Sequence, residues 1–385
     1  MAARPDYDVA ILGGGLAGLS LAVRLAGLPG CRTLIVEPQT EYRRDKTWSY
    51  WRLIDHPFDR AIAARWESWD VIRRNREGAT VTTGRSSASL PYEMIPSDRL
   101  YAVAQELIAG APNIELRLGC HARSIDEQPD GVLVRTSAGE VRAGLVFDSR
   151  PPPAGPRGDL VQRFLGQEVV TDAPVFDAAR VTLMDFAVPQ QPGTVHFLYV
   201  LPTSATEALV EDTWLAPADA ILPDHRAAIR SYLSERFGVT SVTTAFEEQG
   251  AIPMSPGLQA APRAGRVIAI GTAGGAVKPS SGYGFLGIQR MAAALAADLT
   301  AGRQPAPFQP RTALARWMDA VFLGSLRRAP EEAPRIFETL FARCAPEPLI
   351  RFLNDVGRLG DTARVIAAMP KTPMLAAAAR QLLRP

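Results

Sequence analysis

The chain has 385 residues, long enough for two or three compact units that each have a buried core. Its 42 Lys and Arg residues nearly balance 40 Asp and Glu residues, so the net charge of +2 gives no electrostatic reason to expect nucleic acid as a partner. The three cysteines, Cys31, Cys120 and Cys344, form no CxxC pair, which argues against a disulfide framework or a zinc site and favours a reducing cytoplasm.

A glycine-rich motif follows the first apolar segment. Residues 7–12 (YDVAIL) read as a strand, Gly13 to Gly18 as a turn with GxGxxG spacing, and the segment to about residue 26 as a helix. A second strand at 33–36 ends at Glu37. In this order the glycines permit a tight turn, close approach of a pyrophosphate and helix packing, while the acidic residue binds a ribose. The alternative is a tight turn that holds no ligand.

We therefore expect a Rossmann-type domain that binds a dinucleotide. FAD is favoured over NAD because the motif comes early and a second glycine-rich segment, 271–275, follows a late strand at 266–270. Two such loops can hold the two ends of one long cofactor. The residues expected to contact it are Gly13, Gly15, Leu16, Ala17, Gly18, Glu37, Pro38, Gly271, Gly274 and Gly275.

The apolar segments divide the chain into three regions. Short strands at 113–118, 131–136 and 141–148 extend the first sheet, and with the late strand and a helix at 285–299 they make the FAD-binding domain discontinuous, at 1–60, 95–163 and 255–302. Alternating polar and aromatic residues predict a β-sheet substrate-binding domain with one face on a cavity, at 61–94 and 164–254. Residues 303–385 read as a helical region that either caps the molecule or contacts a membrane.

Eight short segments are spaced along nearly the whole chain: KTWSYW at 46–51, YEMIPS at 92–97, FDSR at 147–150, VTLMDF at 181–186, YVLP at 199–202, ALVEDT at 208–213, GAIPM at 250–254 and PSSGY at 279–283. In this order they resemble the bacterial and plant lycopene cyclases, a branch of the flavoprotein monooxygenase-like fold. The resemblance implies that the substrate is lycopene or a related acyclic carotenoid, whose ψ ends are closed to β-rings in a non-redox isomerisation of carotenoid biosynthesis.

The resemblance also implies that FAD acts in its reduced form, with NAD(P)H as the expected reductant. Gly282 and Tyr283 join the expected cofactor contacts. Related flavin hydroxylases usually place an Asp directly after the glycine of the late loop, whereas this chain has Thr272, which argues against hydroxylation. An FAD- and NAD(P)H-dependent hydroxylase of an apolar substrate is the alternative, because one fold supports several reactions.

Protonation of an alkene needs a carboxylic acid that burial keeps protonated. Glu211, in the apolar segment ALVEDTWL, is the expected acid, and Asp212 should face the other way because side chains alternate along a strand. Asp185, in TLMDF, is expected either to support the acid or remove the final proton, or else to be a hydrogen-bonded core residue. Glu248 either shapes the site near the flavin or is an ordinary loop carboxylate.

Aromatic residues in these segments fit a long apolar tunnel, although each can also be simple core packing. Those assigned to the tunnel are Trp48, Tyr50, Tyr199, Trp214 and Phe285. The four histidines show no metal-ligand spacing, so no metal site is expected. Because lycopene must be collected from lipid, we expect a cytoplasmic protein that is peripheral to the membrane, with Phe322, Phe337, Phe341 and Phe352 near the tunnel mouth.

Overall fold

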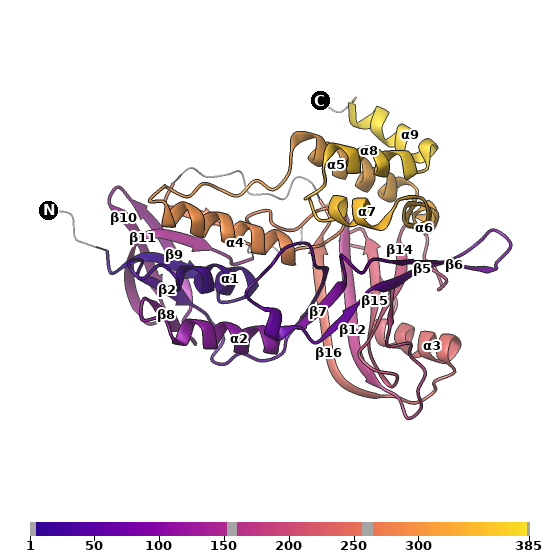
Figure 1. Cartoon of the computed structure of the whole chain (residues 1–385), viewed down its shortest axis with the longest axis horizontal. Helices are drawn as coiled ribbons and strands as arrows, with labels where there is room; N and C mark the ends of the chain where they lie inside the picture. Colours follow the sequence, from indigo (N-terminus) through magenta and orange to yellow (C-terminus); the bar gives the residue numbers. More distant parts are fainter. Residues whose placement is uncertain (1–4, 152–159, 256–264, 383–385) are drawn as a thin grey trace.

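The computed structural model describes residues 5–151, 160–255 and 265–382. Two seven-stranded sheets lie at opposite ends of an elongated molecule, and a three-stranded sheet lies between them (Figure 1). The chain crosses between the two ends several times. The two large sheets are therefore each built from segments that are far apart in the sequence.

The first sheet confirms the expected Rossmann-type α/β fold. Five of its strands run parallel, in the order β8, β2, β1, β11 and β17, and β10 and β9 extend β11 as antiparallel neighbours. Their bounds are β1 Tyr7–Leu12, β2 Thr33–Val36, β8 Ile114–Arg117, β9 Ala122–Gln128, β10 Gly131–Thr136, β11 Gly139–Asp148 and β17 Val267–Ala269. The helices beside it are α1 Leu16–Leu25, α2 Ser97–Ala109 and α4 Phe285–Thr300.

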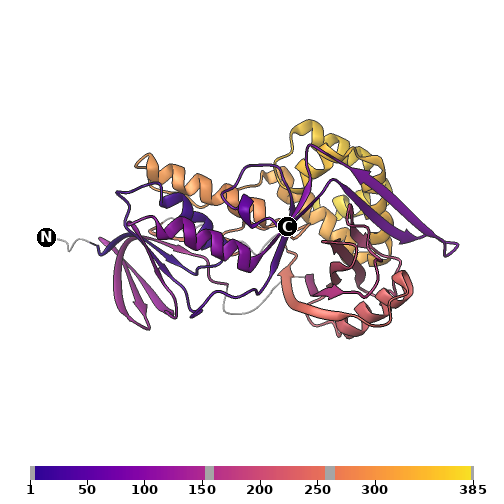
Figure 2. The same cartoon turned by 60° about the horizontal axis from the view of Figure 1, so that its bottom comes forward.

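The second sheet has the order β16, β12, β15, β14, β13, β5 and β6, and its pairs are antiparallel except for β13 with β5. The strands are β5 Ser68–Arg74, β6 Thr80–Ser86, β12 Val161–Val170, β13 Arg180–Asp185, β14 Val195–Pro202, β15 Glu207–Ala216 and β16 Thr243–Pro253. One face is covered by α3, His225–Phe237, which begins at the N-cap Asp224 and ends at Gly238 with φ of 69°. Figure 2 shows α3 and the C-terminal helices on opposite sides of this sheet.

The small sheet joins the two large ones. It consists of β3 Thr47–Trp51, β7 Tyr92–Pro96 and β4 Ala64–Trp66, and a 3-10 turn at Asp59–Ala61 precedes β4. Alternation along β3 splits its side chains between two cores. Tyr50 packs in the core beside the first sheet, whereas Trp51 packs in the core of the second sheet.

The C-terminal region is helical, as the sequence predicts. It contains α5 Ala313–Arg328, a 3-10 turn at Pro330–Glu332, α6 Ala333–Arg343, α7 Pro346–Leu353, α8 Leu359–Ala368 and α9 Lys371–Leu382. A buried ionic cluster ties these helices to the loop before α4, because Lys278 Nζ lies 2.6 Å from Asp355 Oδ1 and 3.0 Å from Asp319 Oδ1. Within the described ranges, no helix is both long and apolar enough to span a membrane.

Candidate active site

The first glycine loop is shaped for a phosphate group. Gly13 has φ of +97°, a left-handed conformation that favours glycine, and a Cβ on Gly18 would lie only 2.0 Å from the carbonyl oxygen of Gly13. By contrast, a Cβ on Gly15, which N-caps α1, would meet no atom within 4 Å. The open space therefore lies at the helix N-terminus, where unpaired amides and the helix dipole favour an anion.

Glu37 lies at the end of β2, beside this loop. Its Oε2 accepts a hydrogen bond of 2.6 Å from the amide of Gly14, and its Oε1 accepts one of 2.9 Å from the amide of Gln39. Each carboxylate oxygen can accept a further hydrogen bond, so the side chain remains able to bind ribose hydroxyls. Pro38, which follows it, is exposed.

The second glycine loop lies against the first. Gly271 and Gly275 have φ of +67° and +77°, and a Cβ on Gly271 would lie 3.0 Å from the Cβ of Ala17. Gly274 packs on the end of β17, where its Cβ would meet the carbonyl oxygen of Ala269 at 2.4 Å. Both loops follow the carboxyl ends of parallel strands, which is where ligands bind in open α/β sheets. The residues present therefore fit a dinucleotide that spans the two loops.

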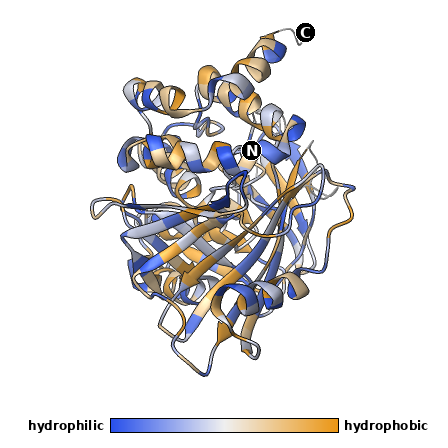
Figure 3. Cartoon of the chain, turned by 90° about the vertical axis from the view of Figure 1, so that its right-hand side faces the viewer, coloured by the Kyte–Doolittle hydropathy of each residue, from blue (hydrophilic) through white to orange (hydrophobic). Residues whose placement is uncertain are grey.

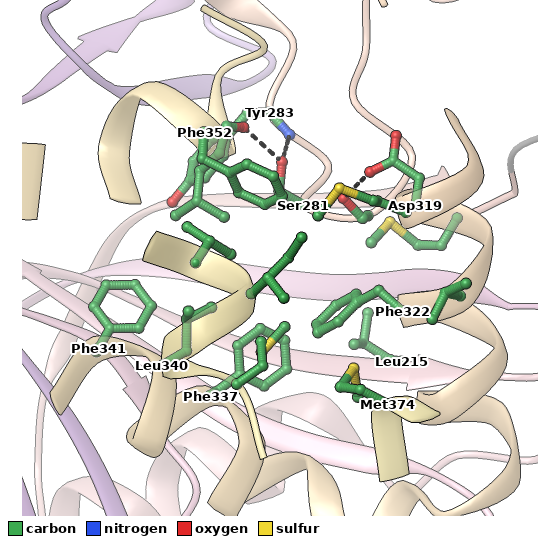
Figure 4. Close-up of a pocket in the computed structure, with 18 of the residues that line it drawn as sticks. Leu215, Ser281, Tyr283, Asp319, Phe322, Phe337, Leu340, Phe341, Phe352 and Met374 are labelled. Atoms are coloured by element: carbon green, nitrogen blue, oxygen red, sulfur yellow. Dashed lines mark hydrogen bonds between the residues drawn. The ribbon is translucent and has the colours of Figure 1, made fainter. Parts of the chain in front are cut away.

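A cavity of about 320 Å³ lies between the second sheet and the C-terminal helices. From the sheet and its neighbouring loop it is lined by Tyr199, Leu215 and Tyr283 among others. Figure 4 shows the aromatic side chains of the opposite wall, which α5, α6 and α7 supply: Phe322, Phe337, Phe341 and Phe352. Its polar lining groups are few, so the cavity suits an apolar ligand.

Glu211 points to the cavity side of the second sheet. It pairs with Tyr199 across β14 and β15, and directly opposite residues of an antiparallel pair share a face. Its Oε1 accepts a 2.7 Å hydrogen bond from the hydroxyl of Thr213. Burial raises the pKa of Glu211 to about 7, a net value in which the hydrogen bond from Thr213 opposes the rise and the neighbouring charge of Asp212 adds to it. A proton is thus held on this carboxyl near neutral pH.

Asp212 faces the other side of the sheet, as the alternation predicts. Its carboxylate accepts hydrogen bonds from His196 Nε2, from His225 Nδ1 at 2.6 Å and from Trp214 Nε1 at 2.9 Å. These bonds lower its pKa against the opposing effect of burial. Asp212 is therefore a charged, hydrogen-bonded residue that holds the strand of Glu211 from the opposite face of the sheet.

The family described as Lycopene cyclase protein matches residues 8–379 of the chain. The chain belongs to the lycopene cyclase family. It is 27% identical over 389 residues to the lycopene beta-cyclase of Pantoea ananas, with 97% of each sequence covered. It is also 28% identical over 318 residues to the lycopene beta-cyclase of a Paracoccus strain, with 78% of this chain and 75% of the relative covered.

Solved structures with the same fold are flavoproteins. A geranylgeranyl bacteriochlorophyll reductase-like protein from Thermoplasma acidophilum matches with a TM-score of 0.61 at 13% identity, covering 96% of this chain and 98% of the other. The flavin-dependent monooxygenase PieE, solved in complex with FAD and substrate, matches with a TM-score of 0.58 at 17% identity, covering 98% and 72%. These likenesses establish a flavoprotein fold for this lycopene cyclase family member.

Two predicted site residues lie on the wrong face for the cavity. Asp185 is buried beneath α3, where it accepts a 2.9 Å hydrogen bond from the hydroxyl of Tyr232. Trp214 lies on the Asp212 face and stacks on the ring of His196 with centroids 3.8 Å apart. The sheet separates both from Glu211, so Asp185 is corrected to a hydrogen-bonded core residue and Trp214 to packing beneath the sheet.

The predicted tunnel aromatics are also divided. Tyr199 lines the cavity, as does Tyr283, one of the expected cofactor contacts. Trp48, Tyr50 and Phe285 instead belong to the core beside the first sheet, where the rings of Tyr50 and Phe285 stack 4.0 Å apart. Trp48 and Tyr50 share one face of β3, and that face is turned away from the cavity.

Glu248, for which the sequence left a role near the flavin or an ordinary loop carboxylate open, lies close to Glu211. It lies in β16 rather than in a loop, it is buried, and its strand pairs with β12 next to the strand of Glu211. Burial and the charge of Glu211 together raise the pKa of Glu248 to about 8, although Thr47 and Arg44 oppose the rise. Alternation in the segment TTAFEEQGAIP could have assigned one of its two adjacent glutamates to the buried face.

Proposed function

We propose that the chain is a lycopene β-cyclase, which closes the ψ ends of lycopene to β-rings through γ-carotene to β-carotene without net oxidation. The observation that carries the proposal is Glu211, a carboxyl that holds its proton near neutral pH on the cavity side of the second sheet. The family supports the reaction class, and the largely apolar cavity supports a hydrocarbon substrate.

Cyclisation begins when a proton reaches the terminal double bond of the ψ end. In the proposed reaction Glu211 gives this proton, the next double bond attacks the resulting cation, and a different proton leaves the new ring. An alkene is a very poor base, so the acid must be well placed and kept protonated. The apolar walls exclude water that would turn the cation into an alcohol. Tyr199 and Tyr283 line the cavity, and aromatic rings can stabilise positive charge there.

FAD is the cofactor that the two glycine loops fit. Gly13, Gly15 and Gly18 would hold the pyrophosphate at the N-terminus of α1, and Glu37 the adenosine ribose. When bound in reduced form, with NAD(P)H as the reductant, FAD would supply negative charge to stabilise a cation. The proposed catalytic step is otherwise carried by the side chains of the chain itself.

Anaerobic conversion of lycopene tests this function. The purified protein, reconstituted with FAD and reduced with dithionite, is expected to convert lycopene in liposomes to carotenoids of unchanged mass that carry β-rings. Chromatography with mass spectrometry detects these products. A requirement for oxygen and a mass gain of one oxygen atom would instead identify an apolar-substrate hydroxylase. Binding of lycopene with no change in spectrum or mass would identify a carrier.

We further propose that α8 and α9 dock on the membrane from which lycopene enters. Ile366 and Leu375 both line the cavity, yet they are 50% and 66% exposed, so they form its rim. Leu382, further along α9, is 74% exposed. Apolar and polar segments alternate along these outermost helices (Figure 3). An exposed apolar rim beside basic residues such as Arg364 suits the lipid interface.

Replacing the rim residues by glutamate should release the protein from lipid. The double variant Ile366→Glu/Leu375→Glu is expected to reduce co-flotation with anionic liposomes by at least about tenfold, because two apolar contacts are lost and two charges repel the lipid. Leu107→Glu is the matched control, since Leu107 is 39% exposed on α2 at the far end of the molecule. Equal flotation of the rim variant and the wild type would contradict membrane docking through α8 and α9.

A further inference from the structure

Glu248 lies in the same cross-strand row as Glu211. Gly166 in β12 pairs with Glu211 on one side and with Glu248 on the other. Residues that are directly opposite each other in antiparallel strands point to the same face. Gly166 has no side chain to separate the two glutamates, and a Cβ there would lie 3.3 Å from Cγ of Glu248. The side chain of Glu248 therefore lies over Gly166, on the cavity side of the sheet.

The surroundings of Glu248 leave part of its carboxyl without a partner. The residue is 5% exposed, and within the described part of the chain its Oε2 has no hydrogen-bond partner. The groups that face it are Glu211, Thr47 and Arg44. Arg44 is itself engaged in an ion pair with Glu168 and lies over the ring of Phe246. A buried oxygen without a partner is costly for folding, which favours a role for it in the reaction.

We propose that Glu248 is the second carboxyl of the cyclisation, and that it takes up the proton that leaves the new ring. This inference rests on the proposed function. Glu211 gives a proton to the terminal alkene carbon, a carbon–carbon bond closes the ring, and a ring C–H bond then breaks with its proton passing to Glu248. No electron is gained or lost. The proton then passes from Glu248 back to Glu211, across Gly166. This transfer restores both groups for cyclisation of the second ψ end of the carotenoid.

The electrostatics of the pair favour a single shared proton, and the higher pKa of Glu248 makes it the better proton acceptor of the two. Two neighbouring carboxyls in a buried site hold one proton between them more readily than they hold two negative charges. Burial raises the pKa of both, and the charge of Glu211 adds to the pKa of Glu248. The pair therefore shares one proton near neutral pH. That proton must lie on Glu211 when the reaction begins, which leaves Glu248 free to accept the proton of the ring.

The products of the variant Glu248→Gln test whether Glu248 is the base. Without that base, the cyclic cation must lose a different proton or react with water. In the reduced, FAD-bound, full-length protein, kcat is expected to fall about 100-fold, the typical contribution of a placed acid or base, with KM within about twofold. The share of products that are alcohols or other ring isomers should rise at least tenfold. The fall in wild-type activity at acid pH, where both carboxyls are protonated and neither can accept a proton, should be lost.

Two further variants complete the test. Glu247→Gln is the matched control, because Glu247 lies on the other face with Arg226 and Gln167 and should leave rate and products unchanged. Gly166→Ala keeps both carboxyls but places a methyl group against Glu248, so it should also increase the non-β products even if Glu248→Gln folds poorly. If both variants make only β-rings with the wild-type pH profile, Glu248 is not the base. Failure of the wild type to convert lycopene would instead overturn the proposed function.

Discussion

Glu211→Gln should reduce the cyclisation of lycopene by at least about 1000-fold while leaving flavin binding intact. Gln has nearly the shape of Glu and can still accept the hydrogen bond from Thr213, but it has no acidic proton to give to an alkene. General acid catalysis typically contributes two to four powers of ten, and water cannot replace the acid in an apolar cavity. The rate of lycopene consumption under anaerobic, reducing conditions measures the effect. A residual rate within tenfold of the wild type would exclude Glu211 as the acid.

The pH dependence of the free energy of unfolding of the same variant distinguishes loss of the acid from loss of the fold. The pKa of Glu211 in the folded protein is about 7, above the value of 4.5 expected when unfolded. The folded state therefore binds more protons between these values, and its stability falls as the pH rises through this window. Gln has no such dependence. Relative to the wild type, Glu211→Gln should gain about 3 kcal/mol in the free energy of unfolding between pH 4.5 and 8, measured by urea denaturation.

Local patterns along the chain were sufficient to predict the Rossmann-type part of the fold. The strand, glycine turn and helix from Tyr7 to Leu25 are adjacent in sequence, so spacing alone determines how they pack. Alternation along β15 likewise placed Glu211 and Asp212 on opposite faces. The same rule applied two residues further on would have put Trp214 with Asp212, beneath the sheet.

The position of Glu248 beside Glu211 depends on strand pairings that no local pattern reveals. Glu248 meets Glu211 because β12 lies between β15 and β16, although β12 and β16 are about 80 residues apart. Asp185 turns under the sheet at the end of β13, where the pairing with β14 and β5 is irregular and simple alternation fails. The domain boundaries also remain a prediction. Residues 68–86 pair within the second sheet, whereas 92–96 pair with β3 on one side and with 64–66 on the other.

Gly15→Ala and Gly18→Ala should separate the binding of a cofactor from the packing of the loop. A Cβ on Gly15 enters open space, and its φ of −77° is available to alanine, so the unfolding temperature without FAD should stay within about 1 °C. If the pyrophosphate lies in that space, the added methyl group displaces it. We expect Kd for FAD to rise at least about tenfold, equivalent to about 1.4 kcal/mol. Fluorescence titration of FAD with the apoprotein measures Kd.

Gly18→Ala, by contrast, should destabilise the folded protein even without FAD. Its Cβ would lie 2.0 Å from the carbonyl oxygen of Gly13 and 3.1 Å from Cγ2 of Ile11, so α1 must move away from β1. Overpacking of this kind typically costs about 1–3 kcal/mol of unfolding free energy even without ligand. FAD binding should weaken as well, because the helix N-terminus moves with α1. If Gly15→Ala binds FAD with wild-type affinity, the loop is only a tight turn. The added methyl group is confined to the proposed phosphate space, so it would then have no effect on FAD binding.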